Sequence, residues 1–179
     1  MVAFTPRGTP ETVPSSNSSV RKLCLYLVGI LMNLCNVDGA NCREVCDLNG
    51  VELFFGMIHL SNEKQILYCL ECIKTCCRQC PECKVGIAEA NEPQNRVGPC
   101  DGIIRIINCF SCPNAHVVTS AIGTASVLLA NHPENMKLFK LANGLNALMQ
   151  VEESWSGKVG VCAARAISNI IRGRFRSQQ

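Results

Sequence analysis

The feature of this sequence that most limits how the chain can fold is an internal repeat. The pair Asn49-Gly50 returns as Asn143-Gly144, and three segments that end on asparagine align over the repeat: 41–49, 83–91 and 135–143. The asparagines are 42 and then 52 residues apart, and the glycine column places the ten extra residues of the middle copy within 92–101. A repeat of about this period predicts stacked units rather than one globular core.

The same register aligns the longest helical segments of the chain, which are 20–36, 62–78, 114–130 and 157–173. Three apolar columns run through them at the spacing i, i+4, i+7: Leu27, Cys69, Ala121 and Ala163; Leu31, Ile73, Ala125 and Ile167; Leu34, Cys76, Leu128 and Ile170. This spacing is the buried stripe of an amphipathic helix. Only 5% of the 179 residues are aromatic and little of the chain alternates as strands do, so four copies of one long helix are predicted.

Two shorter helices are predicted ahead of each later copy of the long helix. Their apolar columns are Val45, Ile87 and Phe139 for the first, and Val51, Ile103, Leu145 and Phe54, Ile106, Leu148 for the second. Proline stands at two starts of first helices, and glycine stands at two of their ends, where positive φ is favoured: Pro81, Pro133, Gly50 and Gly144. Three residues are expected to cap or open long helices: Ser61, Ser156 and Pro113.

Three helices per copy of about 42 residues are typical of armadillo and HEAT arrays. The last copy contains Ala166-Ile167-Ser168-Asn169-Ile170-Ile171, which resembles the third-helix consensus of the armadillo-repeat superfamily. The resemblance covers residues 20–173 and implies an all-α fold, a right-handed α-solenoid of armadillo-type three-helix repeats. We expect a leading third helix at 20–36 and repeats at 38–78, 80–130 and 132–173. Because the leading helix has no first and second helix before it, its apolar face is expected to stack on another chain or within a longer array.

The flanking segments and the composition favour a soluble cytoplasmic protein. Residues 1–19 lack the pattern of a secretory signal and are rich in Pro, Ser and Thr, which predicts a disordered tail; residues 174–179 form a basic tail. With a net charge of +3 and 17% charged residues, we expect neither nucleic acid nor a membrane as partner. The apolar stretches 23–35 and 117–130 fall short of the ~18 residues of a membrane span. Without a signal, the 14 cysteines are expected to be thiols.

The resemblance also implies a binding site, since third helices of armadillo proteins line a concave groove in which asparagines bind the main chain of an extended peptide. The corresponding column here contains Asn33, Thr75, Val127 and Asn169. A carboxamide offers a donor and an acceptor to one peptide unit, which valine cannot do. The column in which importin-alpha proteins carry tryptophan contains Gly29, Glu71, Gly123 and Arg165, so a receptor for nuclear localisation signals is disfavoured.

These columns predict a scaffold that binds a protein or peptide partner along its concave face. Gly29 and Gly123 are expected to leave the groove floor open, and Lys74 and Arg165 to give it positive character, which suits a partly acidic peptide or helix. The insertion at 92–101 is a candidate specificity loop. The alternative interpretation is that all these residues belong to solvated faces of ordinary helices.

The cysteines supply a competing interpretation, a zinc or redox module. Six of them have metal-ligand spacing: Cys76, Cys77, Cys80, Cys83, Cys109 and Cys112. The register disfavours one shared site, because Cys69, Cys72 and Cys76 replace aliphatic residues of other copies. The two groups of cysteines also fall at opposite edges of the array, ~24 Å apart by helix length. A local site formed by the cluster from Cys76 to Cys83 stays open.

No motif of this sequence selects an enzyme active site. The phosphate-binding patterns G-x-x-x-x-G-K-[ST] and G-x-G-x-x-G are missing, as are G-x-S-x-G and H-E-x-x-H. His132 occupies a turn position held by Asp38 and Cys80 in other copies, which predicts helix capping rather than catalysis. We expect no enzymatic activity, no cofactor and no bound metal.

The closing A-A-R-A-I-S-N-I-I-R also resembles the C-terminal helix of ciliary outer-dynein-arm docking armadillo proteins, which leaves a ciliary or axonemal role open.

Overall fold

The computed structural model describes residues 16–58, 62–84 and 102–172. These residues form nine α-helices and one short 3-10 helix and include no strand, so the described part of the chain is all-α, as predicted. The predicted insertion at 92–101, Ile87 and the basic tail 174–179 lie outside them. The predicted disordered tail 1–19 overlaps the first helix, which begins at Ser16.

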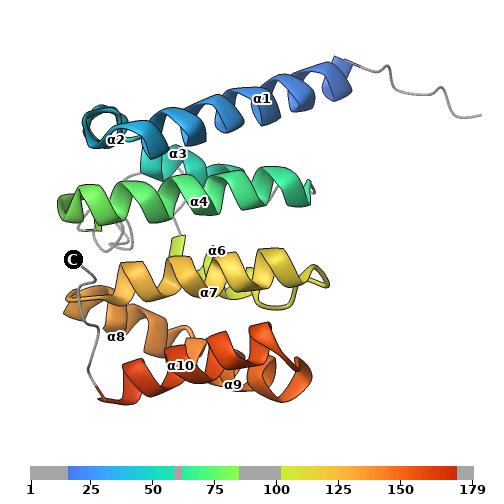
Figure 1. Cartoon of the computed structure of the whole chain (residues 1–179), viewed down its shortest axis with the longest axis vertical. Helices are drawn as coiled ribbons and strands as arrows, with labels where there is room; N and C mark the ends of the chain where they lie inside the picture. Colours follow the sequence, from blue (N-terminus) through green and yellow to red (C-terminus); the bar gives the residue numbers. More distant parts are fainter. Residues whose placement is uncertain (1–15, 59–61, 85–101, 173–179) are drawn as a thin grey trace, which may run out of the picture.

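Four long helices lie side by side in one layer (Figure 1): α1 (Ser16–Val37), α4 (Glu63–Gln79), α7 (Ala115–Leu129) and α10 (Lys158–Arg172). Each packs on the next in chain order, α1 against α4, α4 against α7 and α7 against α10. Their bounds correspond closely to the segments predicted from the apolar columns. The layer therefore brings together parts of the chain that are about one repeat apart.

Shorter helices pack against this layer: α2 (Gly39–Asp47), α3 (Gly50–Met57), η1 (Pro81–Lys84, the 3-10 helix), α6 (Gly102–Cys109), α8 (Pro133–Leu141) and α9 (Gly144–Ser154). α2 and α3 contact α4, α6 contacts α7, and α9 contacts α10. Pro81 opens the single turn of η1, and Pro133 is the first residue of α8, as predicted. Each long helix after α1 thus follows short helices that cover one of its sides.

Hydrogen bonds between the long helices join residues that are about one repeat apart. From α4 to α1, Thr75 bonds to Asn36 and Cys72 bonds to the carbonyl of Val28, over separations of 39 and 44 residues. Between α4 and α7 the corresponding separations are 49 and 54 residues, through Ser120 and Thr124. These values lie on either side of the 42- and 52-residue spacings of the asparagine column.

Asparagine side chains cap two of the long helices. Asn62 Oδ1 accepts hydrogen bonds from the backbone N–H groups of Lys64 and Gln65 at 3.0 and 3.3 Å, which fixes the start of α4. Asn114 Oδ1 accepts from the N–H of His116 at 2.9 Å and begins α7 in the same way. Both residues satisfy N–H groups that have no acceptor within the helix.

The predicted caps differ from these. Pro113 precedes the cap of α7 and does not open the helix. Gly157, at φ 67°, separates Ser156 from the first residue of α10, so Ser156 does not directly precede that helix. Ser61 lies outside the described residues.

The repeated Asn-Gly pair works differently from the prediction. Positive φ occurs at the asparagines, with Asn49 at 56° and Asn143 at 61°, while Gly50 and Gly144 are the first residues of α3 and α9. Asparagine tolerates this left-handed conformation better than most residues. Glycine is required for a different reason: a Cβ at Gly144 would lie 2.5 Å from the buried ring of Phe139. The pair combines a turn with a close contact between two helices.

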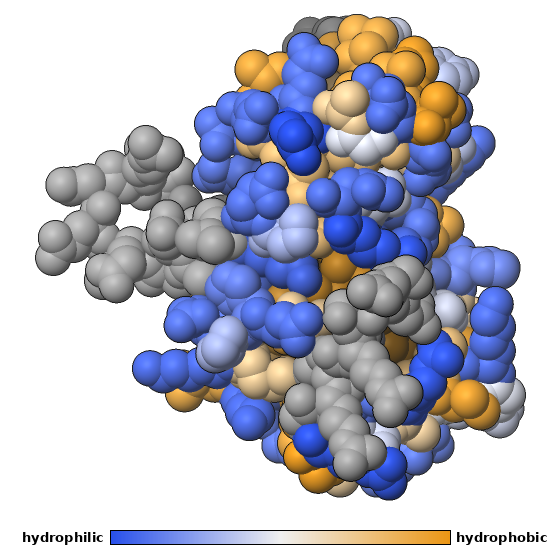
Figure 2. All heavy atoms as spheres, turned by 60° about the vertical axis from the view of Figure 1, so that its left-hand side comes forward, coloured by the Kyte–Doolittle hydropathy of each residue, from blue (hydrophilic) through white to orange (hydrophobic). Residues whose placement is uncertain are grey.

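The core follows the predicted apolar columns in α4, α7 and α10, but not in α1. Cys69, Ala121 and Ala163 have no exposed surface, whereas Leu27 in the same column is 50% exposed. Both α1 and α10 have one long helix as neighbour, but α9 packs closely on α10, whereas α1 packs, among the described helices, mainly on α4 and the short helix α2. The outer apolar residues of α1 are exposed in consequence: Val20, Leu23, Tyr26, Leu27, Ile30, Leu34 and Val37. In Figure 2, apolar atoms gather on the surface at the end of the molecule where α1 and α2 lie.

The same helix bears on the membrane prediction. Within α1, the stretch Ser18–Val37 is long and apolar enough, by length and composition alone, to cross a membrane, although the apolar run at 23–35 is shorter than a membrane span. Its charged residues Arg21 and Lys22 lie near one end, so the rest of the helix keeps a high mean hydropathy. In the structure the helix packs along α4.

Candidate functional site

The eight predicted binding residues are distributed over all four long helices. Asn33 lies on α1; Glu71, Lys74 and Thr75 on α4; Gly123 and Val127 on α7; Arg165 and Asn169 on α10. Asn33 and Arg165 are exposed and the other six are partly buried, so none belongs to the fully buried core. We call these eight residues the interaction face.

An ion pair lies at the middle of the interaction face. Lys74 Nζ is 2.5 Å from the carboxylate of Glu71, one turn earlier on α4, and the Lys74 side chain is only 18% exposed. Ser120 Oγ on α7 donates to the same carboxylate at 2.8 Å. The charge of Lys74 is therefore compensated within the protein, and Arg165 is left as the exposed cation of the face.

Of the two glycines predicted to leave the groove floor open, Gly29 does not do so. A Cβ at Gly29 would lie 3.1 Å from the ring of Tyr68, so this aromatic side chain of α4 covers the space beside α1. At Gly123 the aliphatic stem of Lys74 is 3.9 Å away from the corresponding position. The space beside Gly29 is therefore filled by a large side chain of the neighbouring helix, whereas the space beside Gly123 is largely open.

Polar contacts join some predicted residues and leave others apart. Thr75 Oγ1 donates to Asn36 Oδ1 at 3.2 Å, which connects α4 to α1 and occupies the threonine hydroxyl. Among the described residues, the side chains of Asn33, Asn169 and Arg165 form no hydrogen bond with the protein. The polar groups at the centre of the face, on α4, are therefore bonded to other residues of the protein. The polar groups on the two outer helices, α1 and α10, are free among the described residues.

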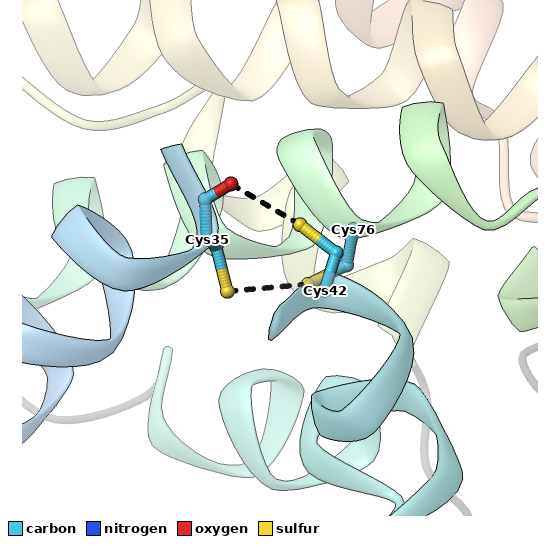
Figure 3. Close-up of side chains that lie close together, drawn as sticks. All are labelled: Cys35, Cys42 and Cys76. Atoms are coloured by element: carbon cyan, nitrogen blue, oxygen red, sulfur yellow. Dashed lines mark hydrogen bonds between the residues drawn. The ribbon is translucent and has the colours of Figure 1, made fainter. Parts of the chain in front are cut away.

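A second group of side chains, which the sequence did not single out, is a cluster of three buried thiols. Cys35 on α1, Cys42 on α2 and Cys76 on α4 have sulfur atoms that all lie within 4.8 Å of one another (Figure 3). The Sγ atoms of Cys35 and Cys76 are 3.9 Å apart, and Cys42 Sγ donates to the carbonyl of Cys35 at 3.3 Å. All three residues are buried. We call them the thiol cluster.

Burial controls the protonation of the thiol cluster. It raises the pKa of Cys42 from 9.0 to about 11, with the neighbouring Cys35 thiol adding to the effect. Burial raises the pKa of Cys76 as well, again with Cys35 contributing. A thiolate loses its hydration in such surroundings, so both residues are neutral thiols at pH 7 unless a cation joins them.

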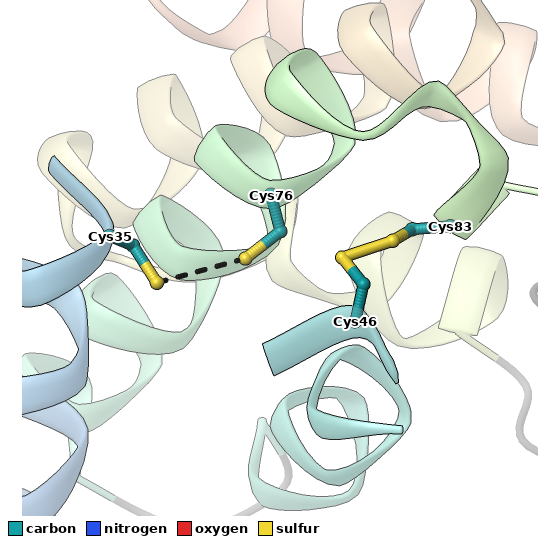
Figure 4. The surroundings of a disulfide bond; sticks show 4 residues. All are labelled: Cys35, Cys46, Cys76 and Cys83. Carbon is teal, nitrogen blue, oxygen red and sulfur yellow. Dashed lines mark hydrogen bonds between the residues drawn. A yellow bond between two sulfur atoms is a disulfide. The ribbon is translucent and has the colours of Figure 1, made fainter. Parts of the chain in front are cut away.

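A disulfide lies close to the thiol cluster and corrects the expectation that every cysteine is a thiol. Cys46 on α2 is bonded to Cys83 on η1, with the Cα atoms 6.0 Å apart (Figure 4). The bond removes Cys83 from the alternative of a local metal site in the cluster Cys76 to Cys83. Of those four cysteines, only Cys76 belongs to the thiol group that the fold brings together.

A signal for these pairings was present in the sequence. Cys35 and Cys76 are 41 residues apart, and Cys46 and Cys83 are 37 apart, both close to the 42-residue repeat. Residues separated by one repeat are neighbours across a stacked array, so the spacing itself points to these contacts. An alignment of residues within one column does not by itself reveal bonds between adjacent columns.

His132 has the capping role predicted for it. Its Nδ1 accepts a hydrogen bond from the backbone N–H of Asn135 at 3.2 Å at the start of α8. Asp38 does the same for α2, accepting from the N–H of Ala40 at 2.9 Å. Two different side chains thus serve equivalent turns, as the column alignment indicated.

Comparison with known proteins adds information on the fold alone. No protein-family model matches the sequence, and no curated protein is similar enough to count as a relative. Two engineered proteins with crystal structures, Northeast Structural Genomics Consortium targets OR329 and OR497, are similar in structure. The first has a TM-score of 0.71 at 16% identity and the second 0.71 at 17%, over 89% and 87% of this chain. The chain spans 59% of the first and 35% of the second. At such identities the likeness supports the all-helical fold and no particular activity.

Proposed function

We propose that this protein is a non-enzymatic scaffold that binds a peptide or helix of a partner protein along the layer formed by α1, α4, α7 and α10. The interaction face would be carried by Asn33, Glu71, Lys74, Thr75, Gly123, Val127, Arg165 and Asn169. The observation that supports this most directly is that all eight residues, chosen from repeat columns, lie on the long helices and outside the fully buried core.

The arrangement that we infer is an armadillo-type, right-handed α-solenoid. In favour of it, one long helix and shorter helices alternate along the chain, and hydrogen bonds between long helices span about one repeat. The segment 166–171 resembles the armadillo third helix, which supports the same arrangement. Such folds expose an extended surface that suits an extended partner.

The chemistry of the face favours a particular mode of binding. Asn33 and Asn169 lie on the two outer long helices, and their carboxamides have no hydrogen-bond partner among the described residues. A carboxamide can satisfy both the N–H and the C=O of one peptide unit. The exposed cation Arg165 favours an acidic residue of the partner near Asn169, whereas Lys74 is already paired with Glu71.

The experiment that tests this role compares the proteins captured by three immobilised forms of the chain, quantified by mass spectrometry. The forms are wild type, Asn33→Ala with Asn169→Ala, and a matched control, Asn108→Ala with Gln150→Ala. The control removes two exposed carboxamides from the short helices α6 and α9.

We expect the main partner to be lost from the first double variant only. If the two carboxamides contribute about 2–3 kcal/mol together, affinity falls roughly 30-fold to 150-fold. Equal capture by all three forms would remove the interaction face from consideration. Loss in both double variants would place binding elsewhere on the molecule.

A further inference from the structure

The thiol cluster has the composition and the spacing of a metal site. Three sulfur atoms from three helices, α1, α2 and α4, converge within 4.8 Å of one another in the interior. Sulfur ligands at ~2.3 Å from a shared ion lie about 3.8–4.0 Å apart, for tetrahedral and trigonal geometry respectively. The Cys35 and Cys76 sulfurs are already 3.9 Å apart. Little movement is needed for all three to reach one ion.

We propose that Cys35, Cys42 and Cys76 form a binding site for one thiophilic d10 metal ion, Cu(I) or Zn²⁺. Soft thiolate ligands select such ions over the hard cations that prefer oxygen. Among the described residues, no fourth His, Cys, Asp or Glu ligand atom joins the three sulfurs within the same 4.8 Å. Three ligands suit three-coordinate Cu(I), whereas structural Zn²⁺ sites are almost always four-coordinate. We therefore expect Cu(I) to bind more tightly.

A disulfide is the other fate open to neighbouring thiols, and the geometry disfavours it here. Sulfur atoms in a disulfide are ~2.05 Å apart, about half the distance between Cys35 and Cys76. The nearby pair Cys46 and Cys83 is bonded, while the three cluster thiols are free. A disulfide between two of the cluster thiols would also leave the third without a role, whereas a metal ion uses all three.

The binding reaction is balanced without any redox partner. Three S–H bonds break, three metal–sulfur bonds form, and three protons pass to solvent, while the ion keeps its oxidation state. The ion replaces the thiol hydrogen bonds, including the one from Cys42 to the carbonyl of Cys35. It also joins α1 to α2 and α4, so bound metal is expected to stabilise the exposed end of the layer.

The test uses the full chain with Cys100 and the partly buried free thiols removed. Cys24, Cys112 and Cys162 are partly buried, and Cys100 lies outside the described residues, so all four are replaced by serine. This background protein is titrated without oxygen or added thiols, in one arm with Cu(I) held by a chromophoric chelator and in the other with Zn²⁺. We expect one equivalent of Cu(I) to be bound, with X-ray absorption showing three sulfur neighbours.

Single variants identify the ligands. In the background protein, Cys35→Ala, Cys42→Ala and Cys76→Ala should each weaken binding about 100-fold or more. Cys69→Ala is the matched control, since Cys69 is an equally buried cysteine of α4 outside the cluster, in a column where other copies have alanine. It should bind as the background protein does, and its melting temperature should rise with metal as well.

Each outcome decides the matter. Binding of one ion, Cu(I) or Zn²⁺, that depends on the three cluster cysteines supports the site and identifies the ion. Binding that survives all three variants, weakens equally in Cys69→Ala, or shows nitrogen and oxygen neighbours overturns it, as does no binding of either ion. If a cluster variant fails to fold, as judged by its helical circular dichroism, the ligand set from X-ray absorption on the background protein decides alone.

Discussion

At the scale of single residues, close packing between helices dictates amino-acid identity more strongly than backbone conformation does. The Asn-Gly pairs illustrate this, because asparagine takes the left-handed turn and glycine provides the space. A Cβ at Gly50 would lie 2.6 Å from Cγ1 of Val45, and one at Gly144 would lie 2.5 Å from the ring of Phe139. The repeat therefore preserves a contact between α2 and α3, and between α8 and α9, as well as a turn.

Replacing one of these glycines by alanine tests this interpretation. Gly144→Ala should lower the free energy of unfolding by about 1–3 kcal/mol, because the Phe139 ring must move out of a packed position. Gly56→Ala is the control, since a Cβ there meets no atom within 4 Å and the residue lies inside helix α3. It should raise stability by about 0.5–1 kcal/mol. Urea denaturation measures both, and a Gly144→Ala protein as stable as wild type would contradict the packing argument.

At the scale of secondary structure elements, the environment of a helix is set by its place in the layer. Helices α4 and α7 are packed on both sides by long helices, whereas α1 has one such neighbour. Apolar side chains of the two helices thus differ in burial: Ile30 on α1 is 55% exposed, and Ile73 on α4 has no exposed surface. The apolar pattern is the same in both helices, but burial of its side chains contributes less to the free energy of unfolding in α1 than in α4.

Matched isoleucine substitutions measure this difference. Ile73→Ala should destabilise the protein by about 2–5 kcal/mol through lost burial and the cavity left behind. Ile30→Ala should change stability by less than about 0.5 kcal/mol, because the side chain is largely in water already. The measurement is urea denaturation at low protein concentration. A large effect at Ile30 would mean that the outer face of α1 is covered in solution, by another copy of the chain for example.

The elements were the part of the fold that the sequence predicted best. Long helices were found because three apolar columns recur at helical spacing in four copies. The sequence also predicts an uncapped apolar face on the first long helix, because no first and second helix precede it, although the column alignment by itself assigns Leu27 the environment of its buried counterparts. The thiol cluster was missed for a related reason: its members come from α1, α2 and α4 and meet only across units. The contact of Tyr68 with Gly29 likewise depends on lateral packing, which helical periodicity does not describe.

At the scale of the whole molecule, the layer is held together by contacts between successive units, and one of them is covalent. The Cys46–Cys83 disulfide joins α2 to η1 over 37 residues of sequence. In the chain-entropy description, closing a loop of this size stabilises the folded state by about 4 kcal/mol, because the unfolded chain loses conformations. Stability should therefore depend strongly on this bond.

Removing the disulfide tests its contribution. Cys46→Ala with Cys83→Ala should lower the free energy of unfolding by up to about 4 kcal/mol, measured by urea denaturation without reductant. Cys112→Ala is the control, as this free and partly buried cysteine should have little effect. Adding a reductant should lower the free energy of unfolding of the wild type and leave that of the double variant unchanged. If wild type and double variant unfold at the same urea concentration, the bond does not form in solution.

The same bridge also changes what a protease can do to the molecule. Any single cut between Cys46 and Cys83 leaves two pieces that are still tied together, so the chain keeps its mass on a non-reducing gel and separates only after reduction. That interval includes the connection between α3 and α4. An intact backbone between the two cysteines is therefore not needed to keep the two fragments covalently joined.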